Sequence, residues 1–388
     1  MQTGFGPFIS VFLTAQRWTQ VDIGLVLSAT GFVSLVGQMP GGALVDAVRS
    51  ERVLAGIGVV AICISALAYA ALPIFPVVLS ASVLHALASC VLGPAMAAIS
   101  LGLVGHAAIG ERLGRNARFA SIGSGFAAAA MGAIGYFLSA RSVFVVTVLL
   151  LGPALLALRF ISPAEIDSER AHGLARQGTP PAERPKRRRP GELMQNRPLL
   201  IFAGCMLLFQ LANAAMLPLM GSVLTMRSAD WATVLIAAFI VVPQLVVAAL
   251  SPWIGERAQV WGRRPLLLAG FAALPLRGLL FAVVANPVLL VAVQLLDGVT
   301  AAVFAVMVPL VVADLTRGTG RFNLGQGIIG TFAGIGASTS STLAGYLSDR
   351  FGSPWAFGGL AVIALAGLVA VTLLMPETRP AEDNEECV

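Results

Sequence analysis

Long apolar segments, most of them about 20 residues in length, alternate with short polar turns along this chain of 388 residues. A helix needs about 20 apolar residues to cross the ~30 Å hydrocarbon layer of a bilayer. The segments are continuously apolar, whereas the strands of a transmembrane barrel alternate residue by residue, so the pattern predicts helices. We predict an all-α polytopic membrane protein with twelve spans, at 2–15, 22–45, 53–73, 77–104, 118–138, 142–160, 198–220, 231–253, 265–285, 287–311, 325–347 and 355–375.

The charged residues indicate how these helices are oriented. Only 11% of the residues are charged, and the net charge of +6 comes from arginines that gather in alternate turns. Cytoplasmic segments carry an excess of Lys and Arg, which predicts cytoplasmic termini. We expect the membrane to be a bacterial inner membrane. Because the basic residues follow one side of the membrane, we expect no nucleic-acid partner. The four cysteines lack metal-binding or disulfide spacing, so we expect no metal and no cofactor.

The segment 161–197 divides the chain into two parts. It is polar, interrupted by prolines and strongly basic, so we expect a mobile cytoplasmic linker that buries no core. We expect an N-terminal six-helix bundle at 1–160, a C-terminal six-helix bundle at 198–376 and a cytoplasmic tail at 377–388.

The two expected bundles are internal copies. A shift of about 210 to 213 positions places Trp18 on Trp231 and Gly42 on Gly255. It also places Pro7 on Pro218, so about 13 residues of the span at 198–220 have no counterpart before Met1. A half-helix would leave a gap in a membrane bundle, so we expect the first helix to be truncated at its N-terminus in this sequence.

Two related loops occupy equivalent places in the copies. Their residues of interest are Gly42, Asp46, Arg49 and Arg52 in the first loop and Gly255, Gly262, Arg263 and Arg264 in the second. The pattern resembles the loop G-x-x-x-D-x-x-G-R-[KR] of the major facilitator superfamily. In the first copy Arg49 stands at the second glycine of this motif, and in the second copy Gln259 stands at its aspartate. The resemblance covers the whole chain and implies a twelve-helix fold made of two six-helix bundles.

These loops have a physical use in a protein with two states. A tight turn needs the backbone freedom of glycine, and Asp46 can pair with an arginine or with the positive N-terminus of a helix. Such a pair can hold in one state and break in the other, so we predict that the eight loop residues form a conformational latch. The resemblance implies that the latch favours the outward-facing state. Alternatively, the arginines only supply the positive charge of the cytoplasmic side.

Three ionisable residues inside the predicted spans are further candidates: His85, Arg277 and Asp297. A charge at the centre of a spanning helix costs about 2.5 to 3.5 kcal/mol, so it usually has a function. Arg277 lies ten residues before Pro287 and Asp297 ten residues after it, which places both ~15 Å below one outer turn. We predict Asp297 as a proton-coupling group, helped by His85 and Arg277. The alternatives are a polar residue packed between helices for His85 and a static ion pair for Arg277 with Asp297.

The resemblance also implies a cavity lined by four of the helices. At position 85 the family often has an Arg-x-x-x-Gly motif linked to proton transfer; here His85 begins His-Ala-Leu-Ala-Ser, and histidine titrates near neutral pH. Gln210, Asn213 and Gln294 lie on expected cavity helices and are candidates to bind a solute. The hydroxyls from Ser338 to Thr342 are more typical of close helix packing.

We predict a secondary transporter that moves a small organic solute by alternating access, as a proton-coupled exporter of the antiporter type. A proton-coupled metabolite importer is the alternative, and a non-transporting receptor or an inactive truncated remnant is an alternative of another class. An enzyme is not expected, because the sequence lacks H-E-x-x-H, G-x-S-x-G and Walker motifs. The expected partners are a small-molecule solute, protons and the lipid bilayer, and we expect a monomer.

The incomplete first helix yields a test at the level of the gene. We expect the DNA upstream of Met1 to encode, in frame, an apolar stretch of at least about 13 residues preceded by a short polar or basic segment. Sequencing of the upstream region checks this. A stop codon directly before Met1 would contradict it.

Overall fold

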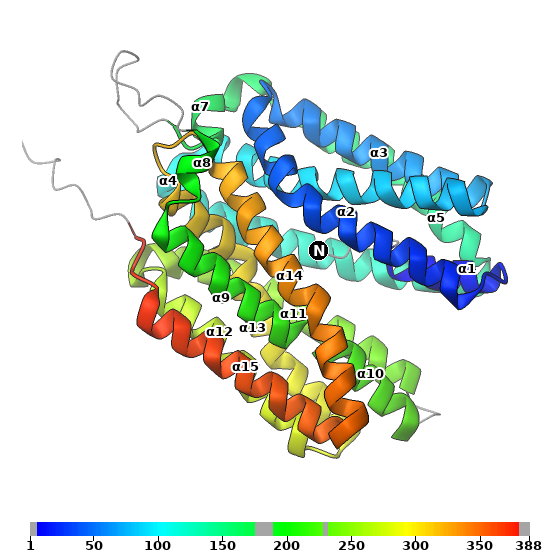
Figure 1. Cartoon of the computed structure of the whole chain (residues 1–388). Helices are drawn as coiled ribbons and strands as arrows, with labels where there is room; N and C mark the ends of the chain where they lie inside the picture. The colour runs from blue at the N-terminus through cyan, green and yellow to red at the C-terminus, as the bar shows by residue number, and fades with distance from the viewer. Residues whose placement is uncertain (1–5, 175–188, 228–231, 380–388) are drawn as a thin grey trace, which may run out of the picture. The chain divides into compact units, whose positions relative to one another are not determined.

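The computed structural model describes residues 6–174, 189–227 and 232–379, and every regular element in these ranges is helical (Figure 1). One 3-10 helix, η1, covers Pro163–Glu165. The α-helices are α1 Gly6–Ala15, α2 Gln20–Ala47, α3 Glu51–Ala71, α4 Phe75–Phe137, α5 Ala140–Leu149, α6 Leu151–Phe160, α7 Ser168–Ala171, α8 Pro190–Leu193, α9 Arg197–Asn213, α10 Met216–Arg227, α11 Ala232–Trp261, α12 Arg264–Val283, α13 Pro287–Leu315, α14 Phe322–Phe351 and α15 Ser353–Leu374.

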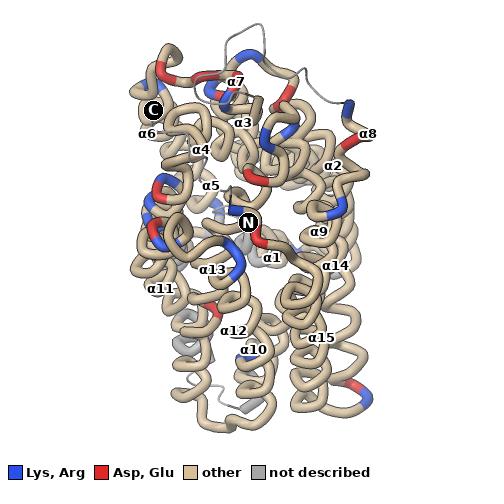
Figure 2. Tube along the Cα trace, turned by 90° about the vertical axis from the view of Figure 1, so that its left-hand side faces the viewer, with Lys and Arg blue, Asp and Glu red and all other residues tan. Residues whose placement is uncertain are grey.

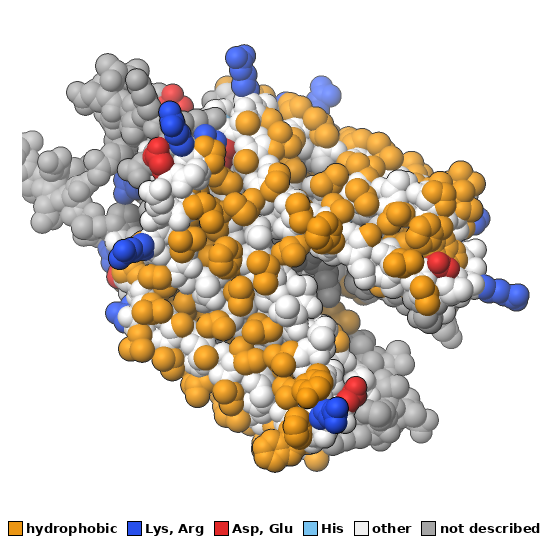
Figure 3. Space-filling view, viewed as in Figure 1, with side chains coloured by type: hydrophobic (Ala, Val, Ile, Leu, Met, Phe, Trp, Pro, Cys, Tyr) orange, Lys and Arg blue, Asp and Glu red, His pale blue; other side chains and the backbone are white. Residues whose placement is uncertain are grey.

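The helices present apolar surfaces that suit a bilayer. Within the described ranges, nine helical stretches are long and apolar enough to cross a membrane. Large hydrophobic side chains such as Phe32, Phe126 and Leu373 are 68%, 77% and 75% exposed, and Figure 3 shows hydrophobic side chains over the visible helix faces. Charged residues lie mainly at helix ends (Figure 2). The prediction of an all-α polytopic membrane protein is confirmed.

Helix boundaries depart from the predicted spans where glycine and proline act. The spans predicted at 77–104 and 118–138 join in α4, which bends at Gly105, where φ is +67°. The span predicted at 142–160 is two helices, α5 and α6, that meet at Leu150 ahead of Pro153. Proline lacks an N–H and its ring collides with the carbonyl four residues earlier, so it favours such breaks.

The described chain forms two compact units, each with its own core. Unit 1 comprises 1–105, 120–187 and 318–334, and unit 2 comprises 106–119, 188–317 and 335–388. In unit 1, Phe144 stacks on Tyr69 at 5.3 Å and meets Phe12 edge-on at 4.8 Å between ring centroids. In unit 2, α12 packs against α13 and α15, and α11 packs against α13. Each unit therefore contains a segment that the sequence repeat assigns to the other half.

The start of the predicted linker is part of unit 1. Ala171 and His172 are buried, and Ile161 and Ile166 pack against the core cluster that contains Val45 and Ala171. The Asp167 side chain accepts hydrogen bonds from Glu169 N and Arg170 N and so caps α7. The prediction that the linker buries nothing is wrong for residues 161–174, because spaced apolar residues there meet the end of the bundle. Residues 175–188 lie outside the described ranges.

The sequence repeat is also a repeat of contacts between backbones. A Cβ added to Gly42 would collide with the Asn323 carbonyl, and one added to Gly255 would collide with the Gly110 carbonyl. The differences 255 − 42 and 323 − 110 are both 213. Gly327 against Gln38 and Gly114 against Ser251 form a second pair with the same shift. Close approach at these points requires glycine, so both copies keep it.

Candidate functional site

A buried charge cluster in unit 2 brings together residues from three helices. Arg277 on α12 forms an ion pair with Asp297 on α13, and the side chains are 3% and 25% exposed. Arg277 Nη2 also donates to Asn213 Oδ1 at 2.5 Å and contacts Met216 Sδ at 3.3 Å. A buried guanidinium needs such partners, because removal from water is costly for an ion. The ion pair expected from equal depth is present.

A break between α9 and α10 places Asn213 beside Arg277. Asn213 is the last residue of α9, and Met216 begins α10. Pro218 cannot bond to the carbonyl of residue 214, so the helix is weakened here. Ser340 of α14, which is fully buried, accepts a hydrogen bond from Ala215 N at 3.0 Å. Ser340 belongs to the hydroxyl residues 338–342, which we expected to mediate helix packing. Its hydroxyl also forms a hydrogen bond with the backbone at the break between α9 and α10.

The other predicted cavity residues differ in their surroundings. Gln210 Oε1 accepts from Asn213 Nδ2 at 3.4 Å, so Gln210 adjoins the charge cluster. Gln294 is 1% exposed and donates to the Phe239 carbonyl at 3.1 Å, so it lies between α13 and α11. A solute can reach Gln294 only if those two helices separate.

His85 belongs to unit 1, whereas Arg277 and Asp297 belong to unit 2. The His85 side chain is 7% exposed. Its carbonyl accepts from Ser89 Oγ at 2.8 Å within α4. Its suggested assistance to Asp297 stays a prediction.

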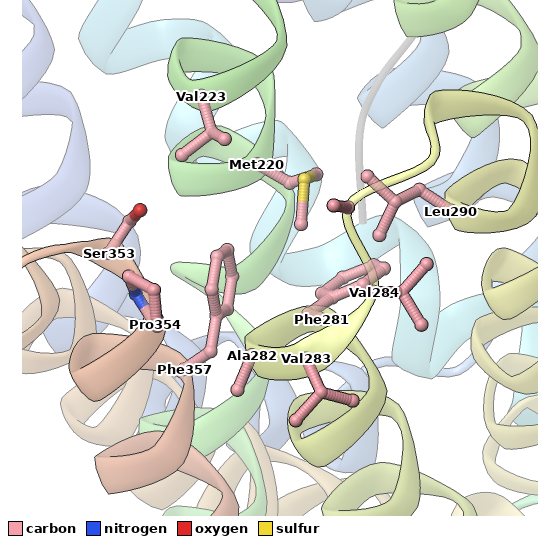
Figure 4. Close-up of a pocket in the computed structure, with 11 residues that line it drawn as sticks. Met220, Val223, Phe281, Ala282, Val283, Val284, Leu290, Ser353, Pro354 and Phe357 are labelled. Atoms are coloured by element: carbon pink, nitrogen blue, oxygen red, sulfur yellow. The ribbon is translucent and has the colours of Figure 1, made fainter. Parts of the chain in front are cut away.

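A pocket of about 140 Å³ within unit 2, lined mostly by hydrophobic residues, includes Phe281, which lies next to Arg277. Phe281 and Phe357 meet edge-on at 5.4 Å, with Met220 and Leu290 nearby (Figure 4). The Arg277 guanidinium carbon lies 5.9 Å from the centre of the Phe281 ring. The cluster therefore has an apolar compartment on one side.

The first loop copy joins two helices that are distant in sequence. Asp46 is fully buried at the end of α2, and its carboxylate accepts from Asn323 N at 3.2 Å, Asn323 Nδ2 at 2.9 Å and Leu324 N at 2.8 Å. These groups form the first turn of α14, where the helix dipole is positive. Of the two partners considered for Asp46, the structure shows the helix N-terminus. Gly42 permits this contact, because its missing side chain leaves room for the Asn323 carbonyl.

The arginines of the first loop contact the linker. Arg52 Nη1 donates to the Ile161 carbonyl at 2.6 Å. The backbone carbonyl of the exposed Arg49 accepts a hydrogen bond from Ser168 Oγ at 3.5 Å. These contacts attach the beginning of the linker to the junction between α2 and α3.

The second loop copy forms a network inside unit 2. Arg263 is 2% exposed and pairs with Asp314 at 2.9 Å, and its Nη1 donates to the Ala258 carbonyl at 2.6 Å and to Gln259 Oε1 at 3.3 Å. Gly262 has φ of +87°, a value that L side chains rarely adopt. Asp314 is the carboxylate partner of Arg263 in this network. Sequence reasoning missed it, because Asp314 lies 51 positions away on another helix.

Glu377, from the tail, caps the start of α12. Its carboxylate accepts from Arg263 N at 2.8 Å and Arg264 N at 3.0 Å, and from the N–H groups of Thr378 and Arg379. Arg264 Nη2 donates to the Thr372 carbonyl at 2.6 Å. Burial alone would raise the pKa of the Glu377 carboxyl, but these four N–H donors hold that pKa below its ordinary value. In the sequence, Glu377 is only an acidic residue two positions after the last predicted span, 355–375, and nothing there indicates that it caps another helix.

Among the residues that the structure describes, no group of three or more His, Cys, Asp and Glu is arranged to hold a metal.

A family model, the Major Facilitator Superfamily, matches residues 1–259 and 202–386. A protein of Mycobacterium tuberculosis (strain CDC 1551 / Oshkosh), an uncharacterized MFS-type transporter, is 40% identical over 382 residues, which cover 97% of this chain and 90% of that protein. A multidrug resistance protein B homolog of the same strain is 29% identical over 139 residues, 35% of this chain and 25% of that protein.

Solved structures resemble the fold at low identity. The Escherichia coli fucose:proton symporter superposes with a TM-score of 0.70 at 16% identity, covering 95% of this chain and 94% of that chain. The human organic anion transporter superposes with a TM-score of 0.67 at 16% identity, covering 95% and 89%. At such identity these likenesses show the fold alone.

Reversal of both charges in the cluster should rescue single reversals. Arg277→Asp or Asp297→Arg alone leaves a like-charge pair in a buried site, at a cost of about 3 to 5 kcal/mol, and the double variant restores an opposite pair. We expect little folded protein from either single variant and substantial recovery from the double, measured by size-exclusion chromatography in detergent. The exposed Arg141→Asp is the control. Full expression of both single variants would contradict this.

The Glu377 cap should make stability depend on pH. The pKa of this carboxyl is lowered by folding from an ordinary 4.5, so its stabilisation is complete above that value and is lost as the pH falls through the folded pKa. Glu377→Gln should cost about 1 kcal/mol, as expected for a lost helix cap. Its melting temperature in detergent should be lower than that of the parent at pH 7, and the two should converge in acid. The exposed Glu165→Gln should match the parent throughout; a gap that persists in acid would show that the charge is not responsible.

Proposed function

Since this chain belongs to the major facilitator superfamily and is a multi-pass membrane transporter, we propose that it exports a small organic solute in exchange for protons, by alternating access. The observation that supports proton coupling is the Arg277–Asp297 pair beside Asn213. We place the transporter in a bacterial inner membrane, with both termini in the cytoplasm and a single chain as the working unit.

Asp297 suits a coupling role because it is the accessible member of the pair. When ionised, its carboxylate offsets the charge of Arg277, and the cluster is neutral. When a proton binds, Arg277 keeps only neutral acceptors, Asn213 Oδ1 and Met216 Sδ, and the cluster carries one positive charge. A net charge in a low-dielectric site disfavours the arrangement that buries it, so proton binding would favour the other state.

Asn213 would transmit that change to the backbone. It accepts from Arg277 at the point where α9 ends, and broken helices at mid-membrane are common at the binding sites of transporters. Gln210 and Asn213 would then bind the solute, and the pocket beside Phe281 would accept an apolar group. Gln294, which is bonded to α11, would become available only in another state.

The loop copies would control the alternation. Asp46 with the first turn of α14 would be the part of the latch that breaks, since its partners belong to opposite halves of the repeat. The Arg263–Asp314–Glu377 network would stay intact, since its members all lie in the second half. By this proposal the intact latch favours the outward-facing state.

Import is the second candidate, because the same cluster could couple protons to uptake. The partial likeness to a multidrug resistance protein homolog favours export. The direction of solute movement under an imposed pH gradient separates the two, and a protein that moves no solute would be a receptor or an inactive remnant.

Asp297→Asn tests the coupling directly. A growth screen of a deletion strain first identifies a solute, and vesicles containing the purified protein then accumulate it under a pH gradient. We expect Asp297→Asn to reduce that accumulation to the level of protein-free vesicles while solute exchange without a gradient continues, because the amide cannot take up a proton. His85→Gln should shift the pH optimum, and the exposed Asp349→Asn should behave as the parent. Parent-like accumulation by Asp297→Asn would make Asp297 a structural partner.

A further inference from the structure

The first turn of α14 is held entirely by residues that precede 175. The N–H groups that open a helix have no partner within it. Phe322 N donates to the His172 carbonyl at 3.3 Å, while Asn323 N and Leu324 N donate to the Asp46 carboxylate. The next N–H group, that of Gly325, donates to the Arg321 carbonyl at 3.0 Å, so the helix supplies its own acceptors from there on. The first three N–H groups are therefore shared between Asp46 and the start of the linker.

The linker contributes a second row of bonds beside Asp46. Gly318 N donates to the Gly173 carbonyl at 2.7 Å, and Asn323 Nδ2 reaches the Ala171 carbonyl at 3.5 Å. Three successive carbonyls, at 171, 172 and 173, thus accept from the segment 318–323. Gly173 and Gly318 both have positive φ, +80° and +76°, a conformation that glycine adopts without strain. We call residues 161–174 the linker clasp.

The clasp is anchored at three points on the N-terminal helices. Arg52 binds the Ile161 carbonyl, and Asp167 N donates to the Gly102 carbonyl at 3.2 Å. At the third point, His172 Nε2 lies 3.1 Å from Glu51 Oε1, with the two side chains 5% and 1% exposed. This close contact of two buried side chains joins the end of the clasp to the start of α3, and we call the two residues the pin.

The clasp is not a by-product of the sequence repeat. In the second half, the residues after the last helix act elsewhere, because Glu377 caps α12. At the contact equivalent to Asp46 with Asn323, Gln259 faces Gly110 and brings no carboxylate.

We propose that the linker clasp is a conformational restraint: pinned by Glu51 and His172, it retains the first turn of α14 on Asp46 and limits how often that turn detaches. Detachment then requires two events, release from the Asp46 carboxylate and release from the carbonyls of 171–173. This regulation rests on the latch proposed above, in which the first turn of α14 leaves Asp46, but it depends neither on the solute nor on proton coupling.

Hydrogen exchange of backbone amides, read by mass spectrometry on the full chain in lipid nanodiscs, tests the clasp without a solute. In His172→Ala, which removes the pin, exchange in peptides that cover 317–325 should rise about fivefold or more, the effect of losing about one net hydrogen bond. Asp46→Asn gives the reference for a released turn. Glu165→Gln, an exposed change in the same segment, is the matched control and should exchange as the parent does.

Peptides that cover 264–283 report on whether the fold is intact, since α12 lies in unit 2. If they also exchange faster in His172→Ala, that variant has disturbed the whole fold and cannot test the clasp. The isosteric Glu51→Gln is then used instead, because it keeps the size of the side chain and removes its charge. Faster exchange at 317–325 with parent-like exchange at 264–283 supports the clasp. Faster exchange confined to 161–174, or none in Glu51→Gln, would overturn it.

Discussion

Backbone N–H and C=O groups in a membrane protein must be paired by the protein itself, because hydrocarbon offers them nothing. Inside a continuous helix this needs no help, but each break or start exposes groups that must find a partner. In this chain the partners come from distant residues: Ser340 at the break before Met216, Glu377 at the start of α12, and Asp46 with the linker at the start of α14.

Two ion pairs of unit 2 differ in exposure. Arg263 and Asp314 are both 2% exposed, and Arg263 has further acceptors at Ala258 and Gln259. Arg277 is equally hidden, but its partner Asp297 keeps a quarter of its surface. The proton-coupling role that we propose for Asp297 rests on this difference, because a sealed carboxylate is costly to protonate or deprotonate.

Repetition of sequence has produced repetition of contacts but not of chemistry. Glycines 42 and 255 meet the carbonyls of 323 and 110 in the same way, so the close approach of backbones is common to both copies. The aspartate is kept only in the first copy, where it binds a helix start, and the paired arginines only in the second, where Arg263 pairs with Asp314.

The helical class, most of the apolar spans, the internal repeat and the equal depth of Arg277 and Asp297 could be predicted from the amino-acid sequence. These follow from hydrophobicity and from the cost of a charge in lipid, which act residue by residue along the chain. Other features became visible only in the folded chain: Asp46 binds the start of α14, Asp314 and Glu377 contact the second loop, Gln294 faces α11, and the linker packs against the core at Ile161, Ile166 and Ala171. Those partners are mostly backbone groups or acids far along the chain. A backbone N–H is identical at nearly every position, so no side-chain pattern marks the one that a distant carboxylate will bind.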